Sequence, residues 1–190
     1  MPSPVGHALG GLVAAFTVDS LARRPRLTLP LQAASAALAV APDLDILAGS
    51  HRTYSHSVGA VAIVAAACWL VRRARYGTAA GTAVLTAAYG SHLFFDWLSK
   101  DTAHPSGLTA LWPFTTRYYE SGLDVFGEIS RRYWLPGEFI IGNITAALWE
   151  LAVLGSLLFV TWVVWSKRTL EEREGEGVRG KGQGVRDKGN

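Results

Sequence analysis

Five apolar stretches occupy most of the chain and constrain its fold more than any other feature of the sequence. They cover residues 5–22, 27–47, 57–71, 79–98 and 147–165. A helix that crosses the hydrocarbon core of a bilayer needs about 20 residues, with a range of about 17 to 25. Four stretches meet this length, and the third is expected to extend into its flanks. The sequence therefore predicts an all-α, multipass membrane bundle of about five helices with a long outer loop.

The composition favours this class over the alternative, a soluble bundle of buried helices. Of the 190 residues, 49% are hydrophobic and only 17% are charged, which is unusual for a soluble domain. The fifth stretch carries one charge, Glu150, and has tryptophans near both ends, where a membrane helix meets the headgroups. The single cysteine, Cys68, lies within an apolar stretch and is interpreted as a buried thiol.

Basic clusters mark alternate connections between the stretches. They are RRPR at 23–26, RRAR at 72–75 and KR at 167–168. Basic clusters beside apolar stretches indicate membrane topology rather than nucleic-acid binding, and positively charged loops remain in the cytoplasm. The N-terminus, the 48–56 turn and the loop from Ser99 to about Ala146 are therefore expected outside.

Two regions follow from this topology. Residues 1–166 form the predicted membrane-embedded domain, to which we assign the functional site. Residues 167–190 mix both charges with many glycines and are predicted to be a disordered cytoplasmic tail.

Imidazole and carboxylate side chains gather on the outer side of the predicted bundle. The candidate metal ligands are His7, Asp43, Asp45, His51, His56, His92 and Asp96. His92 and Asp96 are four residues apart, so they share one face of their helix. Ionisable groups at membrane depth are costly and usually pair or serve a function. The sequence therefore predicts a polar site at the outer membrane boundary.

The residue types indicate a divalent cation. Mixed imidazole and carboxylate ligands suit zinc, with manganese or iron as alternatives. A bound ion would lower the pKa of a coordinated water and supply hydroxide at neutral pH. Arg52 and Asp45 are the candidate catalytic residues. For Arg52 the reason is that a guanidinium matches phosphate oxygens in pairs.

Several neighbouring residues allow more than one interpretation. An isolated HxxxD pair is more often a hydrogen bond on a helix surface, and PDLD is a common turn. His104 is equally compatible with a ligand and with a solvated loop residue. Asp124 suits a helix cap better than a ligand. The others are Asp19 as a cap or interface group, Glu150 at the outer surface, and Ser55 and Ser57 as supporting donors or N-caps. The aromatic loop 104–139 is a candidate lid on the membrane surface.

The order of these motifs resembles that of a known family. GHALGG, PDLD, HRTYSHS, HLFFDWL and LWPF, between residue 6 and about residue 115, are similar to the YdjM-like family of membrane-bound, metal-dependent hydrolases. The resemblance implies a hydrolase of the bacterial inner membrane, with the seven candidate ligands at its motif positions. The His, Asp, His, HxxxD order is also similar to zinc-dependent phospholipase C, although the later HxxxE helix of that enzyme has no counterpart here.

Three functions are compatible with these observations. The first is hydrolysis of a phosphoester, in a lipid or an envelope metabolite, by metal-bound hydroxide at a site facing the extracytoplasmic side. The second is metal binding or transport without hydrolysis, which would require polar residues along a path to the other face. The third is contact between the polar turn and a protein partner. The expected partners are the lipid bilayer and a phosphoester or lipid-like substrate, with no nucleic acid.

Overall fold

The structure is a computed structural model of the whole chain. It describes all residues except 23–26, 50–51, 76–78, 103, 131–132 and 187–190. The described residues form α-helices and short 3₁₀ segments, and their only β interactions are two isolated bridges, Ser99 with Phe126 and Leu108 with Tyr119. The all-α class predicted from the apolar stretches is therefore confirmed.

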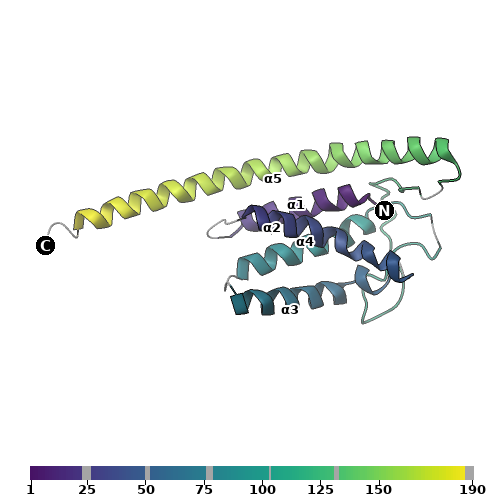
Figure 1. Ribbon diagram of the computed structural model, residues 1–190, viewed down its shortest axis with the longest axis horizontal. Helices are drawn as coiled ribbons and strands as arrows, with labels where there is room; N and C mark the ends of the chain where they lie inside the picture. Colours follow the sequence, from purple (N-terminus) through teal and green to yellow (C-terminus); the bar gives the residue numbers. More distant parts are fainter. Residues whose placement is uncertain (23–26, 50–51, 76–78, 103, 131–132, 187–190) are drawn as a thin grey trace.

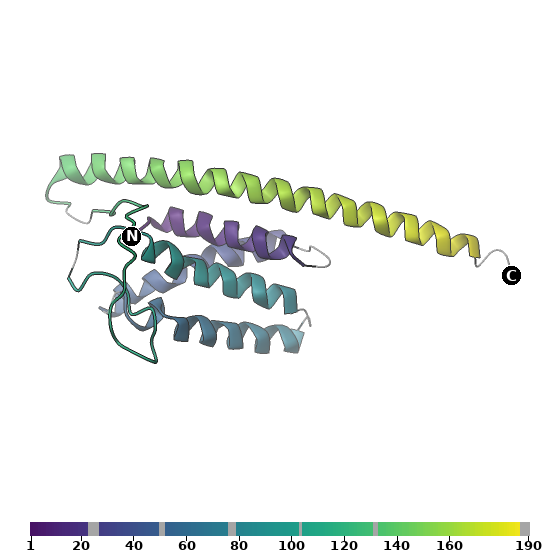
Figure 2. The same ribbon diagram turned by 180° about the vertical axis from the view of Figure 1, so that it is seen from behind.

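Five α-helices and two 3₁₀ helices follow one another in the part of the chain that the structure describes. They are α1 (Pro4–Ser20), α2 (Leu29–Val40), η1 (Ala41–Ala48), η2 (Tyr54–His56), α3 (Val58–Arg75), α4 (Ala79–Trp97) and α5 (Pro136–Arg186). Helices α1 to α4 lie side by side along the first part of α5, which continues well beyond them towards the C-terminus (Figures 1 and 2). The N-terminus and the long loop between α4 and α5 share the opposite end of the bundle.

Helix α1 lies at the centre of the bundle and packs against α2, α4 and α5. A Cβ atom on Gly10 would overlap the ring of Phe95, and one on Gly11 would overlap Ala39. These two glycines therefore allow the close approach of α4 and α2 to α1, as small residues do between membrane helices. Because α1 and α4 lie so close, the side chains near their ends can share one site.

The second apolar stretch does not form the single long helix expected from its length. Helix α2 ends at Val40, and the chain continues as the tighter η1 to Ala48. Pro42 explains the change, because proline lacks an N–H group and its ring clashes with the carbonyl four residues earlier in an α-helix. Gly49, with φ of 73°, ends η1 in the left-handed region. Asp43 and Asp45 therefore lie on a 3₁₀ helix.

The third stretch extends into its C-terminal flank, as predicted, and forms α3 to Arg75. Its start is capped by Ser57, whose Oγ accepts a hydrogen bond of 3.1 Å from the Ala60 N–H. The N-cap interpretation of Ser57 is therefore confirmed.

The last helix begins before, and ends after, the apolar stretch from which it was predicted. Helix α5 begins at Pro136, about ten residues before the expected start, and continues to Arg186 through the region predicted to be disordered. Proline is favourable at the first position of a helix, where no N–H is needed. Beyond Lys167, opposite charges four residues apart, such as Lys167 and Glu171, support the helical conformation.

Buried carboxylates join α5 to α1 at two places. Glu150 accepts hydrogen bonds from the Ser3 N–H at 2.8 Å and the Ser3 hydroxyl at 2.5 Å. Asp19, at the other end of α1, accepts from the Trp165 indole at 2.7 Å and from the Leu27 N–H at 2.9 Å. Asp19 is 3% exposed and connects the two helices, whereas the sequence suggested a cap or a group at the membrane interface. Glu150 is 1% exposed and does not reach the outer surface.

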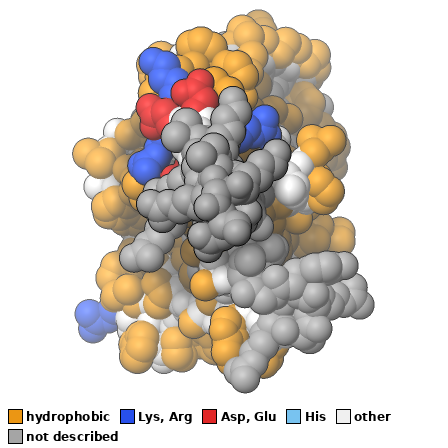
Figure 3. Space-filling model, turned by 90° about the vertical axis from the view of Figure 1, so that its left-hand side faces the viewer, with side chains coloured by type: hydrophobic (Ala, Val, Ile, Leu, Met, Phe, Trp, Pro, Cys, Tyr) orange, Lys and Arg blue, Asp and Glu red, His pale blue; other side chains and the backbone are white. Residues whose placement is uncertain are grey.

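The outside of the bundle is rich in apolar side chains. Seen from the C-terminal end, hydrophobic side chains surround the bundle, and most of the visible charges gather near α5 (Figure 3). Among the described residues, one helical segment, Phe139–Gly175, is long and apolar enough to cross a membrane, and only 11% of its apolar window is buried. The other helices are shorter or less apolar, so the multipass arrangement and its orientation stay predictions.

Candidate metal centre

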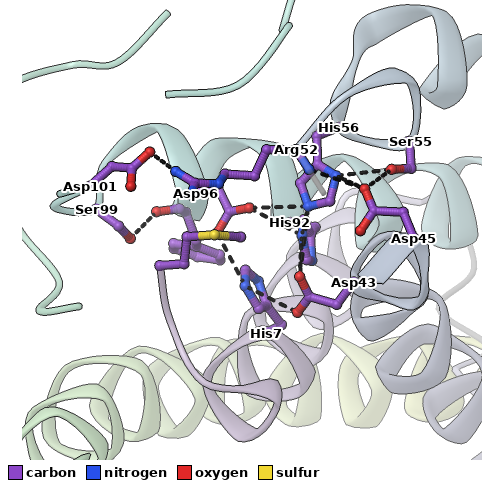
Figure 4. Close-up of polar contacts among 12 residues, drawn as sticks. His7, Asp43, Asp45, Arg52, Ser55, His56, His92, Asp96, Ser99 and Asp101 are labelled. Carbon is purple, nitrogen blue, oxygen red and sulfur yellow. Dashed lines mark hydrogen bonds and ion pairs between the residues drawn. The ribbon is translucent and has the colours of Figure 1, made fainter. Parts of the chain in front are cut away.

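Five side chains from four elements converge at one end of the bundle. His7 comes from the first turns of α1, Asp43 from η1, His56 from η2, and His92 and Asp96 from the last turns of α4 (Figure 4). We call these five residues the His–Asp cluster. All three histidine side chains are fully buried, Asp96 is 1% exposed, and Asp43 is 16% exposed. The cluster therefore reaches the surface through Asp43.

The ligand atoms form two overlapping groups of three. One contains His7, His92 and Asp96, and the other contains Asp43, His56 and His92. His92 belongs to both through Nε2, because its Nδ1 lies 2.7 Å from the Ala39 carbonyl oxygen. A ring nitrogen has one lone pair and serves one ion. The two groups are therefore two parts of a single centre around His92.

The distances within the cluster match the spacing of ligands around a small cation. The Asp96 oxygens lie 3.2 Å from His7 Nε2, 3.2 Å from His92 Nε2 and 3.4 Å from His56 Nε2. Asp43 Oδ1 lies 3.7 Å from Nε2 of both His56 and His92, and these two nitrogens are 3.0 Å apart. Tetrahedral zinc with bonds of about 2.0–2.1 Å separates its ligand atoms by about 3.3 Å.

Two members of the cluster, His7 and Asp96, also fit a cation because their polar atoms lack hydrogen bonds of regular geometry. Neither ring nitrogen of His7 and neither carboxylate oxygen of Asp96 has a hydrogen bond of regular geometry, although all four atoms are buried. The rings of His7 and His92 stack on each other, with their centroids 3.7 Å apart, and no polar group separates them. Buried polar atoms without partners are costly and rare in native proteins. A bound divalent ion would satisfy them.

Asp45 supports the cluster from behind and does not belong to it. Its Oδ2 lies 3.2 Å from His56 Nδ1 and accepts a hydrogen bond of 2.7 Å from the Ser55 hydroxyl. It lies on the far side of the His56 ring from Asp96 (Figure 4). A carboxylate at this position holds the ring so that Nε2 faces the ion. Asp45 belongs to neither ligand group among the described residues, so its assignment as a ligand stays a prediction, and Ser55 is placed to support His56 as the sequence allowed.

The electrostatics of the cluster are those of a cation site. Burial of the His56 imidazole lowers its pKa, but hydrogen bonding to Asp43 and Asp45 and the charge of Asp96 outweigh this effect and raise the pKa to about 9. Three carboxylates thus surround this ring and favour positive charge on it, so a cation that binds His56 would have to displace a proton.

Arg52 lies beside the cluster rather than within it. Its guanidinium forms an ion pair with Asp101, and its backbone N–H donates to Asp45 Oδ2 at 3.1 Å. Its φ of 64° is uncommon for a residue with a side chain, and Asp45 supports this turn. Arg52, Asp43 and Asp101 line one cleft of about 920 Å³. Sequence reasoning missed Asp101, and no motif near it signalled this pairing.

The remaining candidate residues from the sequence lie away from the cluster or outside the described residues. His51 lies outside the described residues. His104 and Asp124 are exposed in the loop, and neither belongs to a ligand group among the described residues. The solvated-loop interpretation of His104 therefore holds in this structure.

The loop between α4 and α5 is packed onto the end of the bundle that carries the cluster. The Val58 N–H donates to the Ala110 carbonyl at 2.8 Å, and the Thr109 N–H donates to the Arg52 carbonyl at 3.2 Å. Phe126 is buried, and the Val125 carbonyl accepts from the Trp149 indole at 2.8 Å. The loop thus brings further residues to the cleft, although a role as a lid stays a prediction.

Comparison with known proteins agrees with the motif order. The model of the family described as YdjM inner membrane protein matches residues 1–170. The chain belongs to this family. The match includes every member of the His–Asp cluster, as well as Arg52 and the loop between α4 and α5. No curated protein and no solved structure matches the chain. Membership of the YdjM family places the protein in the inner membrane, in agreement with the exposed apolar segment of α5.

Proposed function

We propose that this YdjM-family protein is a metal-dependent hydrolase of phosphoesters. The observation that carries the proposal is the buried His–Asp cluster, whose unsatisfied ligand atoms open through Asp43 onto a cleft that also contains Arg52. A merely structural centre would be closed by protein on all sides, whereas a catalytic centre keeps access for substrate. The mixed imidazole and carboxylate ligands favour zinc, with manganese or iron as alternatives.

Each residue has a defined task in this proposal. A divalent ion at such a centre acidifies water and neutralises charge that develops on phosphoryl oxygens. His7, His56, His92 and Asp96 would hold the ion, which would have to keep one further coordination position for water, while Asp45 orients His56. Asp43, the most exposed member, lies where substrate and water enter and can accept a proton there.

Arg52 would orient the phosphoester. Its guanidinium can donate to non-bridging phosphate oxygens, and this contact replaces or shares the present ion pair with Asp101. Asp101 is held in turn by the Gly107 N–H at 2.7 Å, so it keeps the guanidinium at the wall of the cleft. Pre-positioning of this kind lowers the entropy lost when substrate binds.

The transport alternative has less support. A path across the membrane would need polar groups beyond the cluster. Two carboxylates buried elsewhere in the described bundle, Asp19 and Glu150, both accept hydrogen bonds from protein groups that join α5 to α1. They therefore serve packing rather than ion passage.

The test begins with the full chain purified in detergent and its metal content measured by mass spectrometry. Wild-type protein should retain a divalent ion and hydrolyse bis(p-nitrophenyl) phosphate, and a chelator should remove both properties reversibly. His92→Ala should lose both, whereas His104→Ala, which changes an exposed histidine outside the cluster, should keep both. An ion retained by wild type without any phosphoester hydrolysis would reject the hydrolase and favour a metal-binding protein.

A further inference from the structure

The cleft beside the cluster has two chemically different sides. Arg52, Asp101 and Glu128 provide a polar side, and Asp43 links it to the ligand atoms. Leu44 and Leu47 on η1, together with Trp134 from the loop, provide an apolar rim. The volume of about 920 Å³ is near the upper end of ordinary ligand pockets, which are about 300–1,000 Å³. A small ionic ester would occupy only the polar side.

The apolar rim is open rather than packed against the protein. Leu47 is 86% exposed, Leu44 is 61% exposed and Trp134 is 63% exposed. Leu44 lies between Asp43 and Asp45, so one turn of η1 carries both cluster chemistry and exposed apolar surface. In a family of inner membrane proteins, such a rim at a polar cleft suits contact with hydrocarbon, and tryptophan is typical of the membrane interface.

We infer that the substrate is an amphiphile whose phosphoester head lies between Asp43 and Arg52 and whose hydrocarbon chain leaves over Leu44, Leu47 and Trp134. This inference rests on the proposed hydrolase function and narrows its substrate class to lipid-like phosphoesters. The rim holds the chain, so it governs binding rather than the chemistry of the head. Chain length should therefore affect the apparent affinity, and the rim residues should mediate that effect.

The experiment measures binding of non-hydrolysable alkyl phosphonates, from methyl to hexyl, by calorimetry. The full chain is loaded with zinc and held in amphipol, so that no bilayer competes for the alkyl chain. Each methylene buried on the rim should tighten binding by up to about fourfold. The double variant Leu44→Gln/Leu47→Gln should weaken hexyl phosphonate binding by about tenfold and leave methyl phosphonate binding unchanged. The matched control is Ile63→Gln, a residue on α3 that is 62% exposed and does not line the cleft.

The outcomes separate this inference from the proposed function. Equal affinity for methyl and hexyl phosphonate, no binding of either, or a chain-length effect that survives in the double variant would overturn the inference. Hydrolysis of bis(p-nitrophenyl) phosphate, which has no alkyl chain, tests the hydrolase independently. Turnover of this ester without any chain-length effect would leave a phosphoesterase of soluble substrates. A rim-dependent chain-length effect without any turnover would support the amphiphile site and reject hydrolysis.

Discussion

Asp96 offers the sharpest test of the metal centre, because the replacement Asp96→Asn keeps its shape and removes its charge. Its oxygens lie 3.2–3.4 Å from three imidazole nitrogens and have no hydrogen bond of regular geometry. In the metal-free protein, the lost attraction to the imidazoles and the avoided cost of burying a carboxylate oppose each other. These two effects offset each other in part, so the metal-free variant should lose less stability than the zinc-bound one.

The metal-bound protein should respond very differently. At a zinc concentration of about 1,000 times the wild-type Kd, binding stabilises the folded state by about 4.1 kcal/mol. A ligand loss that weakens affinity about 100-fold leaves about 1.4 kcal/mol of this stabilisation, a difference of about 2.7 kcal/mol. For a chain of this size, that difference corresponds to a loss of about 5–11 °C from the zinc-induced rise in Tm.

The assay is thermal unfolding of the detergent-solubilised protein with zinc and with chelator. Asp124→Asn is the matched control, because Asp124 is exposed in the loop and lies outside both ligand groups. The reasoning would be refuted if Asp96→Asn kept the full zinc-induced rise, or if it destabilised the chelated protein as much as the zinc-bound one. The second result would show that Asp96 is a structural partner of the histidines rather than a ligand.

Three other predictions address the support of the site, the packing of α5 and the topology. Asp45→Asn should lower the affinity for zinc about 10- to 100-fold in a chelator competition, because the His56 ring is held less firmly. Unchanged affinity would argue against His56 Nε2 as a ligand. Glu150→Ala should lower the free energy of unfolding by about 3 kcal/mol in chemical denaturation, because two buried hydrogen bonds to a charged group are lost. The control Glu171→Ala, at an exposed position on the same helix, should change it by less than about 0.5 kcal/mol. Reporter fusions after Leu98 and Lys167 should read extracytoplasmic and cytoplasmic, respectively, and the opposite pattern would place the site inside.

Much of the candidate site was accessible from the sequence because the relevant signals are local. His92 and Asp96 had to share a helix face, since the helical repeat alone places residues four apart together. The alternation of basic clusters predicted that the start of α1 and the ends of α2 and α4 lie on the same side of the membrane. Pro42 also carried a local signal that the α-helix would end there, which the length of the apolar stretch obscured. The existence of the helices followed from apolar runs, but the start of α5 did not.

Only the tertiary structure separated the cluster from its support. Asp43 and Asp45 are equivalent in the sequence motif, yet η1 directs Asp43 to the ligand atoms and Asp45 to the rear of His56. The orientation of His92 depends on the backbone carbonyl oxygen of Ala39, 53 positions away. Every residue has such a carbonyl, so nothing in the sequence singles out Ala39. The ion pair of Arg52 with Asp101 depends on how the loop after α4 folds back. Such contacts join distant segments through groups that have no distinctive sequence pattern, so packing alone decides them.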